Sequence, residues 1–234
     1  MTCAFGQALI IPQVADGGGW QTTLVLTNTT TSSTAASVSF YQDTSNGATI
    51  PWNISFLEVA STQSITVPAA ASIFLHSTGT AAATSVGWAS INVGPGVAAY
   101  AIFKQRVLGR QDQEGTATAA AAATRILVPF DNTGGGVTAI AVVNPGASSQ
   151  TISATFRTVE GAVIQGTLDT MPAQGHMAFG MPQQFPRLIG RSGLAEFYST
   201  TGTFSMLALR FNSTNAFTAA PVYPQAGAPI IPLQ

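Results

Sequence analysis

The sequence predicts an all-β protein built from two tandem immunoglobulin-like β-sandwich domains. Short runs such as TTLVLT, SVSFYQ and TISATFR alternate between apolar and polar residues, which is typical of strands that bury one face. Turn-forming residues separate these runs at intervals of roughly ten residues, as they do in sandwiches and barrels. The whole pattern occurs twice along the chain, which indicates a duplicated unit.

The duplication is clearest at the opening strand of each unit. LIIPQVADGGGWQTTLVLTN (Leu9–Asn28) and ILVPFDNTGGGVTAIAVVN (Ile126–Asn144) both carry an apolar run, a proline, an Asp-containing turn, three glycines, an alternating strand and an asparagine. The glycine triplets Gly17–Gly19 and Gly134–Gly136 lie 117 residues apart, as do the two prolines. Glycine accommodates positive φ and close strand approach, so we interpret each triplet as a corner between two strands.

Later segments repeat as well, and together they predict the domain boundaries. SVGWASINVGPGVAAYAIFKQR parallels RSGLAEFYSTTGTFSMLALRFN, each reading as strand, Gly-containing turn and strand. MPQQFPRLIG predicts a single helical turn. We expect a signal-peptide remnant or N-terminal tail at 1–8, sandwich repeats at 9–108 and 125–224, a polar Ala/Thr-rich linker at 109–124 and an extended tail at 225–234.

The composition excludes several classes of partner. Asp, Glu, Lys and Arg make up 7% of the residues, against about 25% in an average soluble domain. Eight basic residues and a net charge of −1 give no electrostatic footprint for nucleic acid. No apolar run of about 20 residues predicts a transmembrane helix. The single cysteine, Cys3, allows no internal disulfide, and a lipid anchor there is an open alternative.

The glycine triplets do not match a nucleotide-binding loop, and we expect no cofactor. A phosphate-binding loop needs a following lysine, whereas the chain's one lysine is Lys104. Asp16, Asp131 and Asn132 lie in the two glycine-rich turns and are weak calcium candidates, because calcium prefers oxygen ligands. The alternative is that these side chains cap their turns.

No catalytic residue stands out. The chain lacks a G-x-S-x-G motif, and its two histidines, His76 and His176, have no Ser and acid partners nearby in sequence. A hydrolase site assembled from scattered residues remains an alternative. We therefore expect that the protein is not an enzyme.

Carbohydrate binding is the second alternative, with an extracellular polysaccharide as the partner. Trp52, between Pro51 and Asn53, is the most plausible exposed ring for a glycan contact. Trp88 and Tyr100 lie on alternating strands and are expected to fill the core.

The C-terminus carries a third copy of the opening motif. Ile-Ile-Pro at 230–232 repeats Ile10–Pro12, with no domain behind it. Ile230, Ile231, Pro232 and Leu233 are therefore candidates for a donor strand that pairs with a neighbouring subunit. The tail could instead fold back on its own domain or be the stub of a longer parent. A trans-pairing tail would also need an open sheet edge to accept it.

The motif IPQVADGGGWQTTLVLTN, together with the ending AIFKQR, resembles a duplicated, uncharacterised β-sandwich repeat of predicted secreted or surface proteins from soil and environmental bacteria. The resemblance covers most of the chain and is weaker in the second unit, where Val137 stands in place of Trp20. It implies export, and it supplies no catalytic residues. We expect a secreted or cell-surface structural or adhesive protein that forms a homo-oligomer or polymer head to tail.

Overall fold

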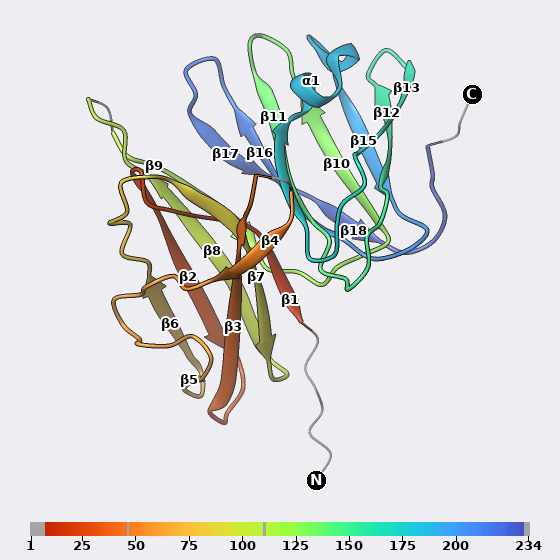
Figure 1. The fold of residues 1–234 in the computed structure, drawn as a ribbon. Helices are drawn as coiled ribbons and strands as arrows, with labels where there is room; N and C mark the ends of the chain where they lie inside the picture. Colours follow the sequence, from red (N-terminus) through yellow and green to blue (C-terminus); the bar gives the residue numbers. More distant parts are fainter. Residues whose placement is uncertain (1–7, 46, 110, 232–234) are drawn as a thin grey trace. The chain divides into compact units, whose positions relative to one another are not determined.

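The computed structural model describes residues 8–45, 47–109 and 111–231, so Cys3, Pro232 and Leu233 lie outside the described residues. The chain is built almost entirely of antiparallel strands, as predicted (Figure 1). The strands are β1 (Leu9–Asp16), β2 (Trp20–Asn28), β3 (Thr34–Asp43), β4 (Thr49–Trp52), β5 (Ile65–Val67), β6 (Ala71–His76), β7 (Ser85–Val93), β8 (Val97–Gln105), β9 (Gln113–Thr118), β10 (Arg125–Asp131), β11 (Val137–Val143), β12 (Ser153–Thr158), β13 (Val163–Thr167), β14 (His176–Gly180), β15 (Ser192–Tyr198), β16 (Ser205–Phe211), β17 (Phe217–Ala220) and β18 (Tyr223–Gln225). The predicted helical turn is present as α1 (Met181–Gln184), followed by a 3-10 turn, η1 (Pro186–Leu188).

Contacts divide the chain into two compact units. Unit 1 comprises residues 1–44 and 49–121, and unit 2 comprises residues 45–48 and 122–234. Unit 1 contains a sheet in the order β1-β7-β3-β4, with β5 also pairing with β3, and a sheet in the order β6-β2-β8-β9. Unit 2 contains the sheets β18-β10-β15-β12-β13 and β14-β11-β16-β17. The two orders agree when β1–β4 are matched with β10–β13 and β6–β9 with β14–β17.

Unit 2 is sandwich-like because side chains from both of its sheets meet in one core, and unit 1 likewise buries apolar side chains from both of its sheets. In unit 2, Phe156 and Phe197 come from one sheet and Ile140 and Val142 from the other, and all four are at most 1% exposed. Burial of such residues, at about 25 cal/mol per Å² of apolar area, is the main stabilising contribution.

The predicted linker at 109–124 is instead partly a strand of unit 1. β9 pairs with β8 over six positions, from Tyr100 opposite Thr118 to Gln105 opposite Gln113. The residues of β9 that face inward are small, with Gly115 and Ala117 buried. The segment therefore lacks the bulky apolar residues by which strands are recognised in a sequence.

In the structure, the residues of the first glycine corner correspond to unit 2 residues 116 positions later, one fewer than the 117 positions of the sequence match. In β1, Pro12 and Gln13 together lie opposite Trp88, whereas in β10 Pro129 alone lies opposite Leu194. This irregularity in β1 adds one residue to unit 1.

Backbone hydrogen bonds show the shift directly. The amide of Trp20 donates to Gly17 O at 2.9 Å, and the amide of Gly136 donates to Thr133 O at 2.8 Å. Trp20 therefore corresponds to Gly136 and not to Val137. Gly17 has a φ of +80°, and a Cβ there would lie 2.4 Å from Ala83 O, so this corner is closely packed.

One asparagine per unit holds the end of its sandwich. Asn28 is 1% exposed, and its Nδ2 donates to the carbonyls of Ser32, Val67 and Pro68. Asn144 is also 1% exposed. Its Nδ2 donates to the carbonyls of Ser148, Met171 and Pro172. The repetition of this contact set supports the internal duplication more strongly than the glycines do.

Candidate functional site

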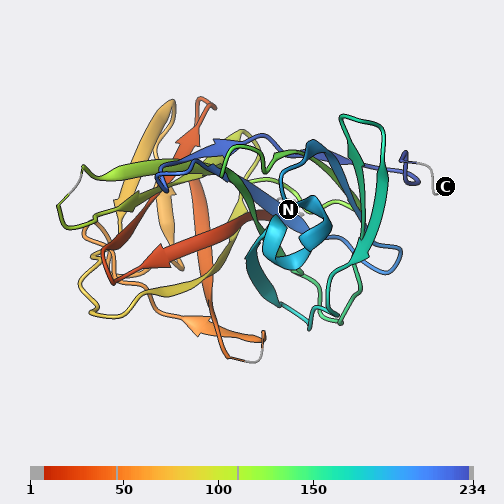
Figure 2. The same ribbon diagram turned by 90° about the horizontal axis from the view of Figure 1, so that it is seen from above.

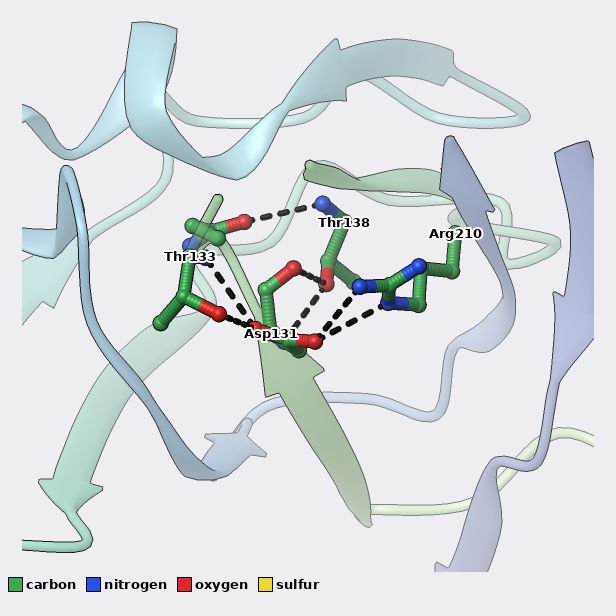
Figure 3. A network of polar contacts seen from close by, with 5 residues as sticks. Asp131, Thr133, Thr138 and Arg210 are labelled. Carbon is green, nitrogen blue, oxygen red and sulfur yellow. Dashed lines mark hydrogen bonds and ion pairs between the residues drawn. The ribbon is translucent and has the colours of Figure 1, made fainter. Parts of the chain in front are cut away.

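The corner of unit 2 is organised around the carboxylate of Asp131 (Figure 3). Its Oδ1 accepts hydrogen bonds from the amide of Thr133 at 3.0 Å and from Thr133 Oγ1 at 2.6 Å. Its Oδ2 accepts from Arg210 Nη2 at 2.7 Å and from Nε at 3.1 Å. The Thr133 hydrogen bonds, followed by those of Arg210, lower the pKa of Asp131 to about 2.

The other two calcium candidates also accept hydrogen bonds from backbone amides. Asn132 Oδ1 accepts from the amide of Thr138 at 2.8 Å, and Asp16 Oδ1 accepts from the amide of Gly79 at 3.0 Å. Within the part of the chain that the structure describes, no group of three or more His, Cys, Asp and Glu side chains is placed to hold a metal ion. Asp131 and Asn132 thus contact residues of their own corner, whereas Asp16 contacts Gly79 in the connection between β6 and β7.

The Asp131 contacts predict acid-dependent loss of stability in unit 2. The pKa of Asp131 in the folded state lies below the ordinary aspartate value of 3.8, so the stabilisation is present above about pH 4 and is lost as the pH falls toward 2. Because the Asp131 side chain is 37% exposed, we expect a loss of at most about 1 kcal/mol. Denaturant titrations between pH 5 and pH 2 should show a shallower decline for Asp131→Asn, while Asp169→Asn, at an exposed acid, should follow the unaltered protein.

Trp52 lines a groove of about 540 Å³ in unit 1. The glycan hypothesis requires a tryptophan that a ligand can reach, and this position is consistent with it. It is half-buried at the end of β4, opposite Phe40 of β3. Trp88 is 1% exposed, but it lies on the face of β7 opposite to the core residue Ala89, stacked on Tyr41 at 4.3 Å. Tyr100 is half-buried on the outward face of β8, so it does not fill the core as expected.

The C-terminal segment folds onto unit 2. β18 pairs with the edge of β10 at three positions, from Arg125 opposite Gln225 to Leu127 opposite Tyr223. Beyond β18, Ile231 is 5% exposed whereas Ile230 is 55% exposed. Of the donor-strand candidates that the structure describes, Ile231 therefore makes the buried apolar contact.

A buried carboxylate receives this segment. Glu196 lies on β15 between the core residues Ala195 and Phe197, so its side chain points to the outer face of the sheet. There, Oε1 accepts the amide of Ile230 and Oε2 accepts the amide of Ile231, each at 2.8 Å. Glu196 is 1% exposed, which for a carboxylate on an outer face means that the tail covers it.

Arg125 completes the arrangement, which we call the tail cradle: Arg125, Glu196 and the tail residues Ala228, Ile230 and Ile231. The Arg125 guanidinium donates to the carbonyl of Ala228, and its Nε lies 3.8 Å from Glu196 Oε1. Sequence reasoning missed both charged residues. A basic residue and an acid 71 positions apart carry no mutual sequence signal, and neither has a charged counterpart in unit 1, where Ala8 and Ser90 stand.

His76 is paired with a carboxylate on the surface of unit 1. His76 Nδ1 lies 2.6 Å from Glu58 Oε1, and the His76 amide donates to Glu58 Oε2 at 2.7 Å. Desolvation is the largest single influence on Glu58 and raises its pKa, but the hydrogen bonds from the backbone and side chain of His76 and the smaller favourable contributions together lower the pKa below its ordinary value. The hydroxyl of neighbouring Ser77 accepts a hydrogen bond from the amide of Thr22 at 2.9 Å.

Comparison with models of protein families and with curated protein sequences gives no match to this chain. Among the described residues, no helix has both the length and the apolar character needed to cross a membrane.

Proposed function

We propose that this is an exported, non-enzymatic structural or adhesive protein, and that its C-terminal segment joins copies head to tail. Each copy would consist of two immunoglobulin-like sandwiches. In the immunoglobulin order, the last strands F and G are neighbours in one sheet, and the strand before them, E, lies in the other sheet. Here β8 and β9 are neighbours and β7 lies in the other sheet, and β16, β17 and β15 repeat this arrangement in unit 2.

The observation that carries the proposal is the tail cradle. Glu196 and Arg125 belong to the body of unit 2, while the groups they hold belong to a short terminal segment. The tail of a second copy offers the same two amides, the same carbonyl and the same isoleucine. Exchange of an identical element between copies reproduces the contacts at low cost, and repeated head-to-tail exchange gives a chain.

Because the tail also binds the cradle of its own copy, exchange of tails between copies depends on the protein concentration. A short flexible connection keeps a segment at an effective concentration on the order of 1 mM around its own site. Gly227, with a φ of +94°, lies between β18 and the cradle and is suited to a change of path. We therefore expect closed monomers in dilute solution and assembly where copies are concentrated, as on a cell surface.

The β1 edge of unit 1 favours the tail cradle over simple strand addition at that edge as the joint between copies. The outward-facing amide and carbonyl of Ile10 pair with Ala120, and those of Ala15 pair with the hydroxyl of Thr22. Pro12 between them has no amide to donate. β1 is thus a blunted edge of the kind that resists pairing with another chain.

The few charged side chains support a structural role. Besides the tail cradle, Asp131 is paired with Arg210, Glu58 with His76, and Lys104 with Asp112 at 3.0 Å. In each case the groups tie one segment of a unit to another. The proposal of export rests on the resemblance of the corner motif.

Shortening the chain tests the proposal. A chain ending at Gln225 keeps β18 but lacks the tail, and we expect it to fold and to remain monomeric at concentrations where the full chain forms larger particles. Light scattering and electron micrographs measure this directly. Ile231→Asp should also prevent assembly, because it places a charge at a buried position, while Ile230→Asp at the exposed neighbour should not. Assembly by the shortened chain, or a full chain that stays monomeric near 1 mM, would overturn the proposal.

A further inference from the structure

The same end of the sandwich is closed differently in the two units, and the difference leaves a groove in unit 1. Phe40 of β3 and Phe156 of β12 are equivalent, because they lie opposite Ala89 and Ala195 respectively. In unit 2, the ring of Phe185, just after α1, packs on Phe156 at 4.7 Å. Met181 and Leu188 of the same α1–η1 segment are fully buried, so this segment closes the end (Figure 2).

In unit 1 the corresponding aromatic partner comes from another part of the chain. Phe56, in the connection after β4, packs on Phe40 at 5.5 Å. Trp52 stands opposite Phe40, where unit 2 has Ile164 opposite Phe156. Ile164 is 5% exposed and belongs to the core, whereas Trp52 is half-buried at the groove.

The connection that forms the groove is an extension specific to unit 1. Val67 and Met171 are equivalent, because the carbonyl of Val67 accepts a hydrogen bond from Asn28 and the carbonyl of Met171 accepts one from the equivalent Asn144. From Trp52 to Val67 the chain advances 15 positions (67 − 52), and from Ile164 to Met171 it advances 7 (171 − 164). Extended loops on a rigid scaffold are frequent carriers of binding function.

Several contacts hold this extension in one conformation. The amide of Leu57 donates to His76 O at 2.9 Å, and the carboxylate of Glu58 is hydrogen-bonded to His76 Nδ1 at 2.6 Å. At the other end, the amide of Val38 donates to Thr62 O at 2.8 Å, and Thr62 Oγ1 donates to Val38 O at 2.9 Å. A groove formed in advance binds without the cost of ordering a loop.

The chemistry of the groove is aromatic and neutral-polar. Its lining residues include the aromatic Tyr41 and Trp52, and Asn53, Ser55, Ser61 and Gln63, which carry amide or hydroxyl side chains. Among the described residues that line it, none is Asp, Glu, Lys, Arg or His. Its volume of about 540 Å³ is within the range of ligand sites.

We propose that the groove beside Trp52 binds a neutral carbohydrate. A sugar ring presents an apolar C–H face that packs on an indole, and a rim of hydroxyls that exchange hydrogen bonds with amides and hydroxyls. A lining without ionised side chains offers no ion-pair partner to the carboxylates or sulfates of an acidic polysaccharide. Binding should therefore depend little on salt. The site deepens the adhesive part of the proposed function by naming a ligand class, and it is independent of the tail cradle.

The test measures binding to a panel of soluble polysaccharides by affinity electrophoresis and calorimetry, with neutral glucan, mannan and xylan in one arm and alginate and polygalacturonate in the other. We expect at least one neutral polysaccharide to bind, and Trp52→Ala to weaken its affinity about tenfold or more. Trp52→Phe, which keeps a ring, should retain part of the affinity. Phe74→Ala removes an aromatic side chain that is 47% exposed on β6, and it should bind normally.

The outcomes separate this site from the assembly. The chain ending at Gln225 should bind the same polysaccharide with unchanged affinity, because the groove lies within residues 39–63. Binding confined to the acidic polysaccharides, no binding to any neutral one, or full affinity in Trp52→Ala would each overturn the proposal. A Trp52→Ala chain whose circular dichroism matches the unaltered protein excludes unfolding as the cause of lost binding.

Discussion

Glu196→Ala is expected to lower the free energy of unfolding of unit 2 by about 3 kcal/mol. The substitution removes the acceptor of two backbone amides and leaves Arg125, whose side chain is 10% exposed, without its carboxylate. Breaking a buried ion pair from one side costs about 3–5 kcal/mol, and release of the tail lets water reach the arginine, which favours the lower figure. Urea unfolding measured by circular dichroism gives the difference.

The duplication supplies the control for this substitution. Ser90 occupies the position in β7 that Glu196 occupies in β15, since it lies opposite Ile10 where Glu196 lies opposite Leu127. Ser90→Ala should change the free energy of unfolding by less than about 0.5 kcal/mol. Equal effects of the two substitutions would show that Glu196 does not hold a buried segment.

Asn144→Ala should destabilise unit 2 by a similar amount, about 3 kcal/mol. Its Nδ2 serves three carbonyls, and its Oδ1 accepts the amide of Gly146 at 3.0 Å and Gln150 Nε2 at 2.8 Å. Each buried polar group left without a partner costs about 1–3 kcal/mol, and water entering the vacated space recovers part of that. Thermal unfolding monitored by circular dichroism reports the loss.

Asn28→Ala should reproduce the effect in unit 1, because Asn28 makes the corresponding three contacts. Asn92→Ala, at an exposed position of β7, should leave the unfolding midpoint nearly unchanged. If both substitutions lowered the free energy of unfolding by less than about 1 kcal/mol, the hydrogen bonds of these buried asparagines would not hold the ends of the sandwiches.

The sequence predicted the all-β class and the single helical turn because both depend on local signals. Period-2 alternation marks strands such as β2, β3 and β12, where one face is apolar and bulky. The Pro-x-x-x-Pro spacing around α1 marks its start and end. The internal similarity identified corresponding strands, although the irregularity at Pro12–Gln13 displaced the corners by one residue, since matching identical glycines cannot reveal an inserted residue in a strand.

Features that depend on tertiary contacts were beyond the sequence. β9 buries Gly115 and Ala117 and has no bulky side chain, so its composition resembles that of a linker. Glu196 looks like an ordinary outward-facing acid until the tail is placed over it. The groove around Trp52 depends on which segment covers Phe40, and only a comparison of the two folded units shows that Phe56 takes the place of Phe185.

The central claim, that the tail cradle accepts the tail of another copy, can be measured by complementation. The chain ending at Gln225 has a cradle without a tail, and the Glu196→Ala chain has a tail without a complete cradle. We expect the isotopically labelled shortened chain, titrated with unlabelled Glu196→Ala chain up to about 1 mM, to show saturable NMR shifts at amides of β10 and β15. The same titration with a Glu196→Ala, Ile231→Asp chain should produce none. Unshifted β10 and β15 amides in the first titration would mean that the cradle binds its own tail alone, and the account of assembly would be wrong.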